Sequence, residues 1–211
     1  MVRKSLSACG VVVSFLLIAS QALAADVAAK GAELYSAYKY EDAVKELRKA
    51  LDADPENLAA RYYLGLSLLQ LEDYKGAEEQ LKKAEEAKAE QVPRLDQIKV
   101  GLARVSMEQK DYDKARAYLD EAAANNADNL DVYLYRGKLA LHREDYTAAA
   151  SELEKAVEMN PEAAYAHYYS ALAYNKLKRP DRMVSEFQVF LKLAPDAPEA
   201  NKVRSLLRSV R

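Results

Sequence analysis

The chain has 211 residues, of which half are hydrophobic and 30% are charged, with only six glycines and six prolines. This composition favours a folded, helical protein over a disordered one. The 31 basic and 33 acidic side chains leave a formal net charge of -2, which argues against a strong global attraction to nucleic acid. A single cysteine excludes an intramolecular disulfide and a cysteine-based zinc site, and two histidines leave little for a histidine-metal site. We therefore expect neither a cofactor nor a bound metal.

The first 24 residues have the three-part layout of a secretory signal peptide. Arg3 and Lys4 give a positive start, residues 6–19 are apolar and uncharged, and residues 22–24 form an Ala-Leu-Ala cleavage site. The apolar stretch is shorter than the ~20 residues that span a bilayer. We expect cleavage after Ala24 and export to a bacterial periplasm. The alternative is an uncleaved amino-terminal anchor, so that any membrane contact is indirect or through this segment.

A second processing site has to be weighed in the same segment. Residues 6–9, Leu-Ser-Ala-Cys, match the letters of a bacterial lipoprotein site. In lipoprotein precursors the apolar region precedes the cysteine, whereas here most of it follows Cys9. We therefore interpret the match as a coincidence. The rival interpretation is that Cys9 is acylated.

The remainder of the chain repeats one motif. The string Tyr-x-x-Ala occurs at residues 40–43, 74–77, 112–115 and 146–149, with its alanines 34, 38 and 34 positions apart. A further 34 positions lead to Met183. A 34-residue period of paired helices resembles the tetratricopeptide repeat family.

The resemblance extends to several places of five repeats, at about residues 24–57, 58–91, 96–129, 130–163 and 164–197. The eighth place is small, namely Gly31, Gly65, Ala103, Gly137 and Ala171. The twenty-fourth is large and apolar, namely Leu47, Leu81, Leu119, Leu153 and Phe187. The twenty-seventh is Ala50, Ala84, Ala122 and Ala156, and then Phe190.

The resemblance implies an all-α fold, a right-handed superhelical solenoid of helical hairpins over residues 25–197. Small residues at the eighth place let the two helices of a hairpin approach closely, and the large residue at the twenty-fourth place fills the space between hairpins. A single hairpin cannot bury its own apolar face, so the hairpins must stack. Residues 198–211 contain an amphipathic pattern, with Val203, Leu206 and Leu207 on one stripe, that predicts a carboxyl-terminal capping helix.

No catalytic motif stands out along the chain. It contains no G-x-S-x-G, H-E-x-x-H, P-loop or G-x-G-x-x-G pattern. His142 and His167 each fit an exposed or partly packed helix position. We therefore do not expect an enzyme.

The resemblance implies protein binding in a concave groove lined by the first helix of each repeat. Tyrosine suits such a groove, because it offers a large flat surface at low entropic cost and a hydroxyl for peptide backbone. Packing between hairpins is an equal alternative for these tyrosines. The candidate groove residues are Tyr62, Tyr63, Arg104, Tyr135, Lys138, Tyr165, Tyr168 and Tyr169, with Tyr35 beside them in the first repeat.

The sequence thus predicts a non-catalytic scaffold or adaptor of the cell envelope that binds a peptide or helix of a protein partner. Arg104 and Lys138 are candidates to hold an acidic group of that partner. Alternatives are an outer-membrane-associated factor for protein insertion or pilus biogenesis, and a structural protein that self-assembles into a homo-oligomer.

Overall fold

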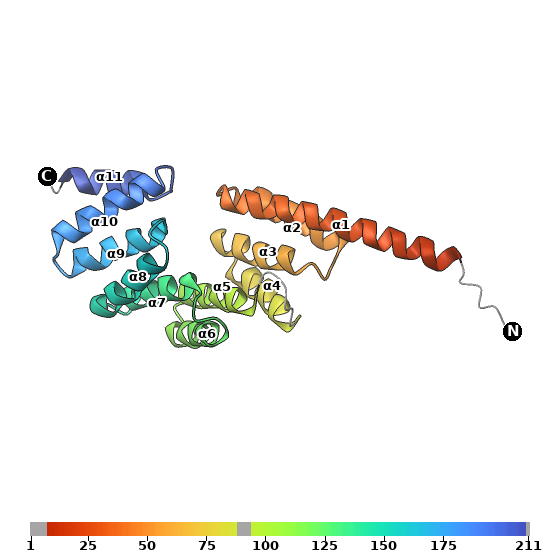
Figure 1. Ribbon diagram of the computed structural model, residues 1–211, viewed down its shortest axis with the longest axis horizontal. Helices are drawn as coiled ribbons and strands as arrows, with labels where there is room; N and C mark the ends of the chain where they lie inside the picture. Colours follow the sequence, from red (N-terminus) through yellow and green to blue (C-terminus); the bar gives the residue numbers. More distant parts are fainter. Residues whose placement is uncertain (1–7, 88–93, 210–211) are drawn as a thin grey trace. The chain divides into compact units, whose positions relative to one another are not determined.

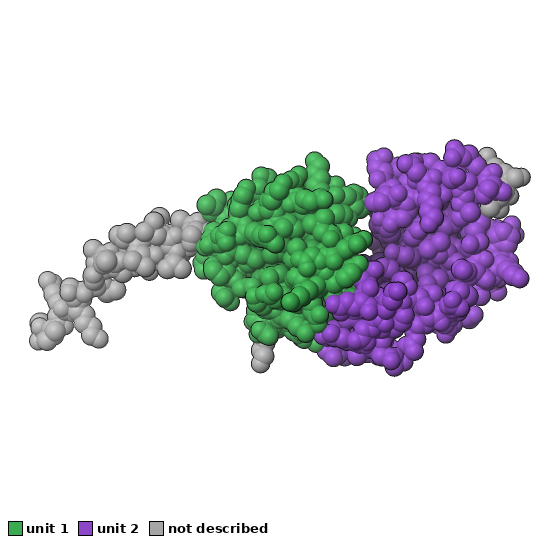
Figure 2. Space-filling view, turned by 180° about the vertical axis from the view of Figure 1, so that it is seen from behind, with its two compact units in different colours: residues 1–105 green, residues 106–211 purple. Residues whose placement is uncertain are grey.

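The computed structural model describes the backbone of residues 8–87 and 94–209, and the side chains of these ranges from Gln21 onward. These residues form eleven helices and no strand (Figure 1). The chain divides into two compact units, residues 1–105 and 106–211 (Figure 2), which are described separately.

Unit 1 contains two helix hairpins and most of a further helix. The first hairpin is α1 (Ala8–Ser36) with α2 (Tyr40–Ala53), and the second is α3 (Leu58–Gln70) with α4 (Tyr74–Glu86). α5 (Leu95–Glu108) follows, and its last three residues belong to unit 2. α2 packs on α3, and α1 also contacts α3, so the first helices of the two hairpins are neighbours.

Unit 2 continues the same arrangement. It contains α6 (Tyr112–Asn125), the hairpin of α7 (Leu130–His142) and α8 (Tyr146–Met159), the hairpin of α9 (Ala164–Lys176) and α10 (Pro180–Leu193), and then α11 (Ala200–Ser209). α8 packs on α9, and α7 also contacts α9. α11 contacts α10 and buries Val203, with Leu206 and Leu207 half-buried beside it.

Short polar side chains start most of the second helices. Asp73, Asp111 and Asp145 each precede such a helix and accept a hydrogen bond from a backbone N–H three residues further on. These bonds satisfy amides that have no partner within the helix. Pro180 occupies the first turn of α10, where its missing N–H costs little.

The hairpins close on small residues. A Cβ added to Gly65 would lie 2.7 Å from Leu81 Cγ, and one added to Gly31 would lie 2.5 Å from Leu47 Cγ. The leucines at the twenty-fourth place are fully buried, as are the alanines of the Tyr-x-x-Ala strings and those at the twenty-seventh place of the first four repeats. The core of each unit therefore consists of close helix–helix contacts that recur from one hairpin to the next.

Several sequence predictions fall outside the described residues. Most of the expected signal peptide, with Cys9, lies in residues 1–7 and in residues 8–20, whose side chains are not described. Residues 88–93, before the third repeat, also lie outside the described ranges. From Gln21 onward, no helix within the described part of the chain is long and apolar enough to cross a membrane.

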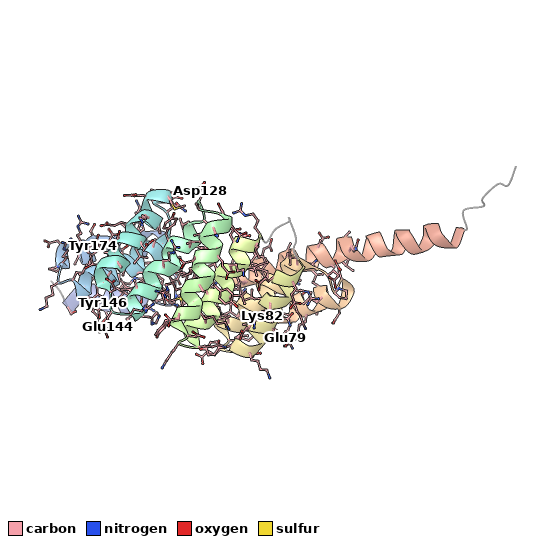
Figure 3. All side chains as sticks on the ribbon, turned by 90° about the horizontal axis from the view of Figure 1, so that it is seen from below. Glu79, Lys82, Asp128, Glu144, Tyr146 and Tyr174 are labelled. Atoms are coloured by element: carbon pink, nitrogen blue, oxygen red, sulfur yellow. The ribbon has the colours of Figure 1, made fainter. Side chains whose placement is uncertain are left out.

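Every turn inside a hairpin places a non-glycine residue at positive φ. The five residues recur at the fifteenth place of each repeat, with φ between 56° and 63°: Tyr38, Glu72, Lys110, Glu144 and Lys178. Glu144 lies at the turn that leads to Tyr146 and α8 (Figure 3). The left-handed conformation costs a side chain about 1–2 kcal/mol, and glycine avoids most of this cost.

Glu144→Gly is therefore expected to raise the free energy of unfolding by about 0.5–1 kcal/mol. The matched control is Glu121→Gly in the middle of α6, where glycine should lower stability by about 1 kcal/mol. Urea denaturation followed by circular dichroism measures both. Destabilisation by both variants alike would mean that the turn tolerates Glu144 without strain.

Candidate functional site

The first helices of unit 1 bring three tyrosines and an arginine together. The rings of Tyr35 on α1 and Tyr63 on α3 have centroids 5.9 Å apart, and those of Tyr62 and Tyr63 are 5.2 Å apart. The Arg104 guanidinium of α5 donates to the Tyr35 hydroxyl at 3.3 Å. We call Tyr35, Tyr62, Tyr63 and Arg104 the unit 1 cluster. Three of the candidate groove residues therefore share one surface with Tyr35.

The first helix of the last hairpin in unit 2 carries a second aromatic group. Tyr165, Tyr168 and Tyr169 on α9 form a mutually contacting set, with ring centroids 5.2–6.2 Å apart. Lys138 on α7 lies 5.9 Å above the Tyr169 ring. We call Tyr165, Tyr168, Tyr169 and Lys138 the unit 2 cluster.

The charge of Lys138 has an acidic neighbour. Its ammonium lies 3.1 Å from a carboxylate oxygen of Glu108 at the end of α5. An acidic ligand at Lys138 would compete with Glu108. Arg104 donates to the Tyr35 hydroxyl and lies in the other unit.

All side chains of the two clusters are half-buried, and Tyr135 on α7 is half-buried as well. Tyr135 packs against the apolar core of unit 2. A half-buried tyrosine can either bind a partner or pack within the fold. The contacts that each ring makes inside the protein distinguish these two roles.

Two members of the unit 2 cluster have clear internal contacts. The Tyr168 ring lies 5.1 Å from Phe190 and 5.9 Å from Phe187 on α10. The Tyr165 hydroxyl donates to Glu199, the residue before α11, at 3.0 Å. Tyr165 and Tyr168 therefore stabilise the last hairpin and the capping helix, whatever else they contact.

Burial affects the acidity of the Tyr168 phenol. Its pKa is raised above the ordinary value, first because partial burial disfavours the phenolate and second because the Glu199 carboxylate repels it. The pKa of Tyr168 is higher in the folded protein than in the unfolded chain. Its contribution to the free energy of unfolding is therefore present below about pH 10 and is lost as pH rises through the folded pKa.

We expect Tyr168 to ionise after the exposed tyrosines in an alkaline titration followed by phenolate absorbance. Tyr168→Phe should remove one of the late steps of that titration, which Tyr174 shares because its pKa is raised as well. Removal of an early step instead would show that the phenol is well solvated.

The two histidines have different surroundings. His142 is exposed and stacks on Tyr112 with centroids 5.6 Å apart. Its pKa is lowered, mainly by partial desolvation and then by Lys138, while Glu108 acts in the opposite direction. His167 is only 6% exposed, and both ring nitrogens have partners, Glu186 at 2.6 Å and the Pro161 carbonyl at 2.9 Å. His167 is therefore a buried connector of α9, α10 and the preceding turn, rather than an exposed or partly packed residue.

A polar cluster on α8, α9 and α10 was not anticipated from the sequence. Tyr174, labelled in Figure 3, donates to Glu154, and Arg182 bonds both, with its guanidinium 3.0 Å from Glu154 and 2.8 Å from the Tyr174 hydroxyl. The three residues lie on different helices, and their spacing of 20 and 8 positions carries no local signal. Within the described ranges, no group of three or more His, Cys, Asp or Glu side chains is arranged to hold a metal ion.

The comparisons with known proteins agree with this architecture. Residues 28–92, 100–158 and 140–198 match the tetratricopeptide repeat family. The matches cover most of the chain, which therefore belongs to the tetratricopeptide repeat family.

Solved structures support the same fold. The thermophilic tetratricopeptide repeat protein TTC0263 of Thermus thermophilus aligns with a TM-score of 0.73 at 19% identity, over 88% of this chain and 97% of its own. The Pseudomonas aeruginosa protein pilF aligns with a TM-score of 0.64 at 21% identity, over 90% and 85%. YrrB, described as a tetratricopeptide repeat protein with an unusual peptide-binding site, aligns with a TM-score of 0.51 at 22% identity, over 83% and 88%. The predicted all-α repeat fold is confirmed.

One curated relative is a much longer protein. Cell division cycle protein 27 homolog A of Arabidopsis thaliana is 28% identical over 100 residues, which are 47% of this chain and 14% of the relative. The chain thus matches only a small part of that protein's length.

Proposed function

We propose that the protein is a non-catalytic scaffold that binds a segment of a partner protein on the first-helix faces of its repeats. Membership of the tetratricopeptide repeat family supports a protein–protein interaction role in general. The observation that carries the proposal is the unit 1 cluster, in which three half-buried tyrosines and an arginine from three first helices share one surface.

The chemistry of this cluster suits an extended peptide or a helix. The three tyrosines are half-buried, so each keeps some exposed surface that a ligand could contact. Phenol hydroxyls and the guanidinium can bond backbone carbonyls or a carboxylate. The rigid rings also lose little conformational entropy on binding.

The unit 2 cluster contributes through fewer residues. Tyr169 and Lys138 are the better candidates there, because Tyr165 and Tyr168 already hold α10 and the segment before α11. Tyr135 is the weakest candidate, since it packs against the core.

The finer proposal is an adaptor of the cell envelope. The signal-peptide layout of residues 1–24 supports export to the periplasm. Outer-membrane assembly and pilus biogenesis are the specific roles we consider. Mass spectrometry of the mature amino terminus tests this part: we expect a chain that begins at Ala25, whereas an acylated Cys9 would indicate a tethered lipoprotein.

Affinity capture from an envelope extract tests the binding proposal. The variant Tyr62→Ala/Tyr63→Ala should lose at least tenfold of the recovery of a specific partner, because a buried aromatic anchor is commonly worth 2 kcal/mol or more, on the order of a 30-fold change in affinity. The matched control is Tyr118→Ala on α6, a half-buried tyrosine of a second helix.

Circular dichroism accompanies each capture, so that loss of binding is separated from loss of folding. Recovery of every partner at wild-type levels by a folded Tyr62→Ala/Tyr63→Ala protein would contradict the proposed surface. Equal loss with Tyr118→Ala would show that the effect is not specific to the first helices.

A further inference from the structure

The bond after Ala24 lies inside a folded helix. α1 runs from Ala8 to Ser36 without interruption, so both Ala24 and Ala25 are helical. This helix packs along α2. The expected cleavage site and the first repeat therefore overlap in the chain.

The buried face of α1 includes the residue at the expected cleavage site. Ala24 is 0% exposed, and Ala28 and Gly31 are buried on the same face, four and seven residues further on. Gly31 approaches Leu47 so closely that an added Cβ would lie 2.5 Å from its Cγ. No protease can reach the carbonyl of Ala24 while α1 is docked in this way.

The helical conformation also separates the two alanines that define the site. A protease that recognises Ala-x-Ala binds the chain as an extended strand, in which residues two apart point to the same side. In an α-helix, residues two apart differ by about 200°. Ala22 is accordingly exposed while Ala24 is buried, and Leu23 between them is 62% exposed.

We infer that cleavage after Ala24 has to precede the docking of α1 on α2, so that folding of the first hairpin and removal of residues 1–24 compete. This inference rests on the proposed export. The reaction is hydrolysis by a membrane-bound endopeptidase specific for small residues: water adds across the Ala24–Ala25 bond, leaving a carboxylate on Ala24 and an amino group on Ala25. A chain that folds first keeps its leader, and a chain that is cleaved first folds with a first helix of residues 25–36.

The test compares two starting states of the full-length chain with such a signal endopeptidase in detergent. In one arm the chain is diluted from urea into the protease, so that folding and cleavage start together. In the other arm the chain is folded beforehand. We expect a product that begins at Ala25, identified by mass, in the first arm and at least tenfold slower cleavage in the second.

A matched pair of variants identifies the protecting contact. Leu47 and Leu153 occupy the same place in the first and fourth hairpins, and both are 0% exposed. Leu47→Ala should accelerate cleavage of the folded chain by about 30-fold. Cleavage follows the fraction of chains in which the first hairpin is open, and truncating a buried leucine raises that fraction by at least this factor. Leu153→Ala should leave the rate unchanged.

The outcomes separate the inference from the proposal beneath it. If no cleavage occurs in either arm, the proposal that residues 1–24 are a signal peptide is wrong, and so is the inference that rests on it. Equal rates in both arms, or equal acceleration by Leu47→Ala and Leu153→Ala, would overturn the inference while leaving export in place.

Discussion

Gly137→Ala is expected to lower the free energy of unfolding of unit 2 by about 2 kcal/mol, although alanine is the better helix former. The reason is steric: an added Cβ would overlap Cγ of Leu153 and would lie 2.8 Å from its Cδ2. Leu153 is fully buried, so it has no free space to move into. Hydrogen exchange of the α7 and α8 amides in urea measures the loss locally.

A double-mutant cycle tests this steric cause. Leu153→Ala removes the overlapping atoms and alone should cost about 2–5 kcal/mol. Gly137→Ala in that background should cost much less than in the wild type, because the overlap has gone. Strictly additive losses would show that Gly137 matters for another reason.

Phe190→Ala is expected to cost about 3–4 kcal/mol, even though it restores the residue found at this place in the other four repeats. Phe190 is 0% exposed, and its ring meets those of Tyr165 and Tyr168 at 5.9 and 5.1 Å. Alanine there would leave a cavity between α9 and α10. Thermal unfolding followed by circular dichroism provides the measurement.

Phe190→Leu serves as the milder control and should cost about 1–2 kcal/mol, since it fills most of the space. A Phe190→Ala protein as stable as wild type would mean that the last hairpin closes around alanine as the others do. Tyr168 would then lack the packing role that we assign to it.

The repeating part of the fold follows from the sequence because each place has a local steric reason. Glycine or alanine at the eighth place and leucine at the twenty-fourth fit helices that touch, and Gly65 does approach Leu81 in this way. The capping helix was predictable from the apolar stripe that includes Val203, which is buried. Asp73, Asp111 and Asp145 each accept a capping hydrogen bond at a helix start, where a short acceptor side chain is favoured.

The departures from the repeat were harder to predict, because their partners are distant in sequence. His167 looked like an ordinary helix residue, and its burial depends on Glu186, 19 positions away. The pairing of Lys138 with Glu108 spans 30 positions, so no local sequence pattern indicates it. Phe190 stood out as a deviation from alanine, but only the structure places Tyr168 against it.

The sequence indicated which repeat positions could form the candidate site, but it did not indicate which side chains contact one another there. The resemblance directed attention to Tyr62, Tyr63 and Arg104, and these residues do lie with Tyr35 in unit 1. Whether a half-buried tyrosine packs or recognises depends on the neighbouring side chains. That is why Tyr165 and Tyr168 acquire internal roles, while the binding role of the whole set stays a prediction.

Site-specific photo-crosslinking in the cell tests the central proposal most directly. A photoreactive phenylalanine analogue replaces Tyr63 in the unit 1 cluster, Tyr169 in the unit 2 cluster or, as the control, Tyr118 on α6. We predict a discrete crosslinked protein at position 63, with the same or a weaker product at position 169, and none at position 118. A product of equal yield at position 118, or none at either cluster, would contradict binding on the first-helix faces.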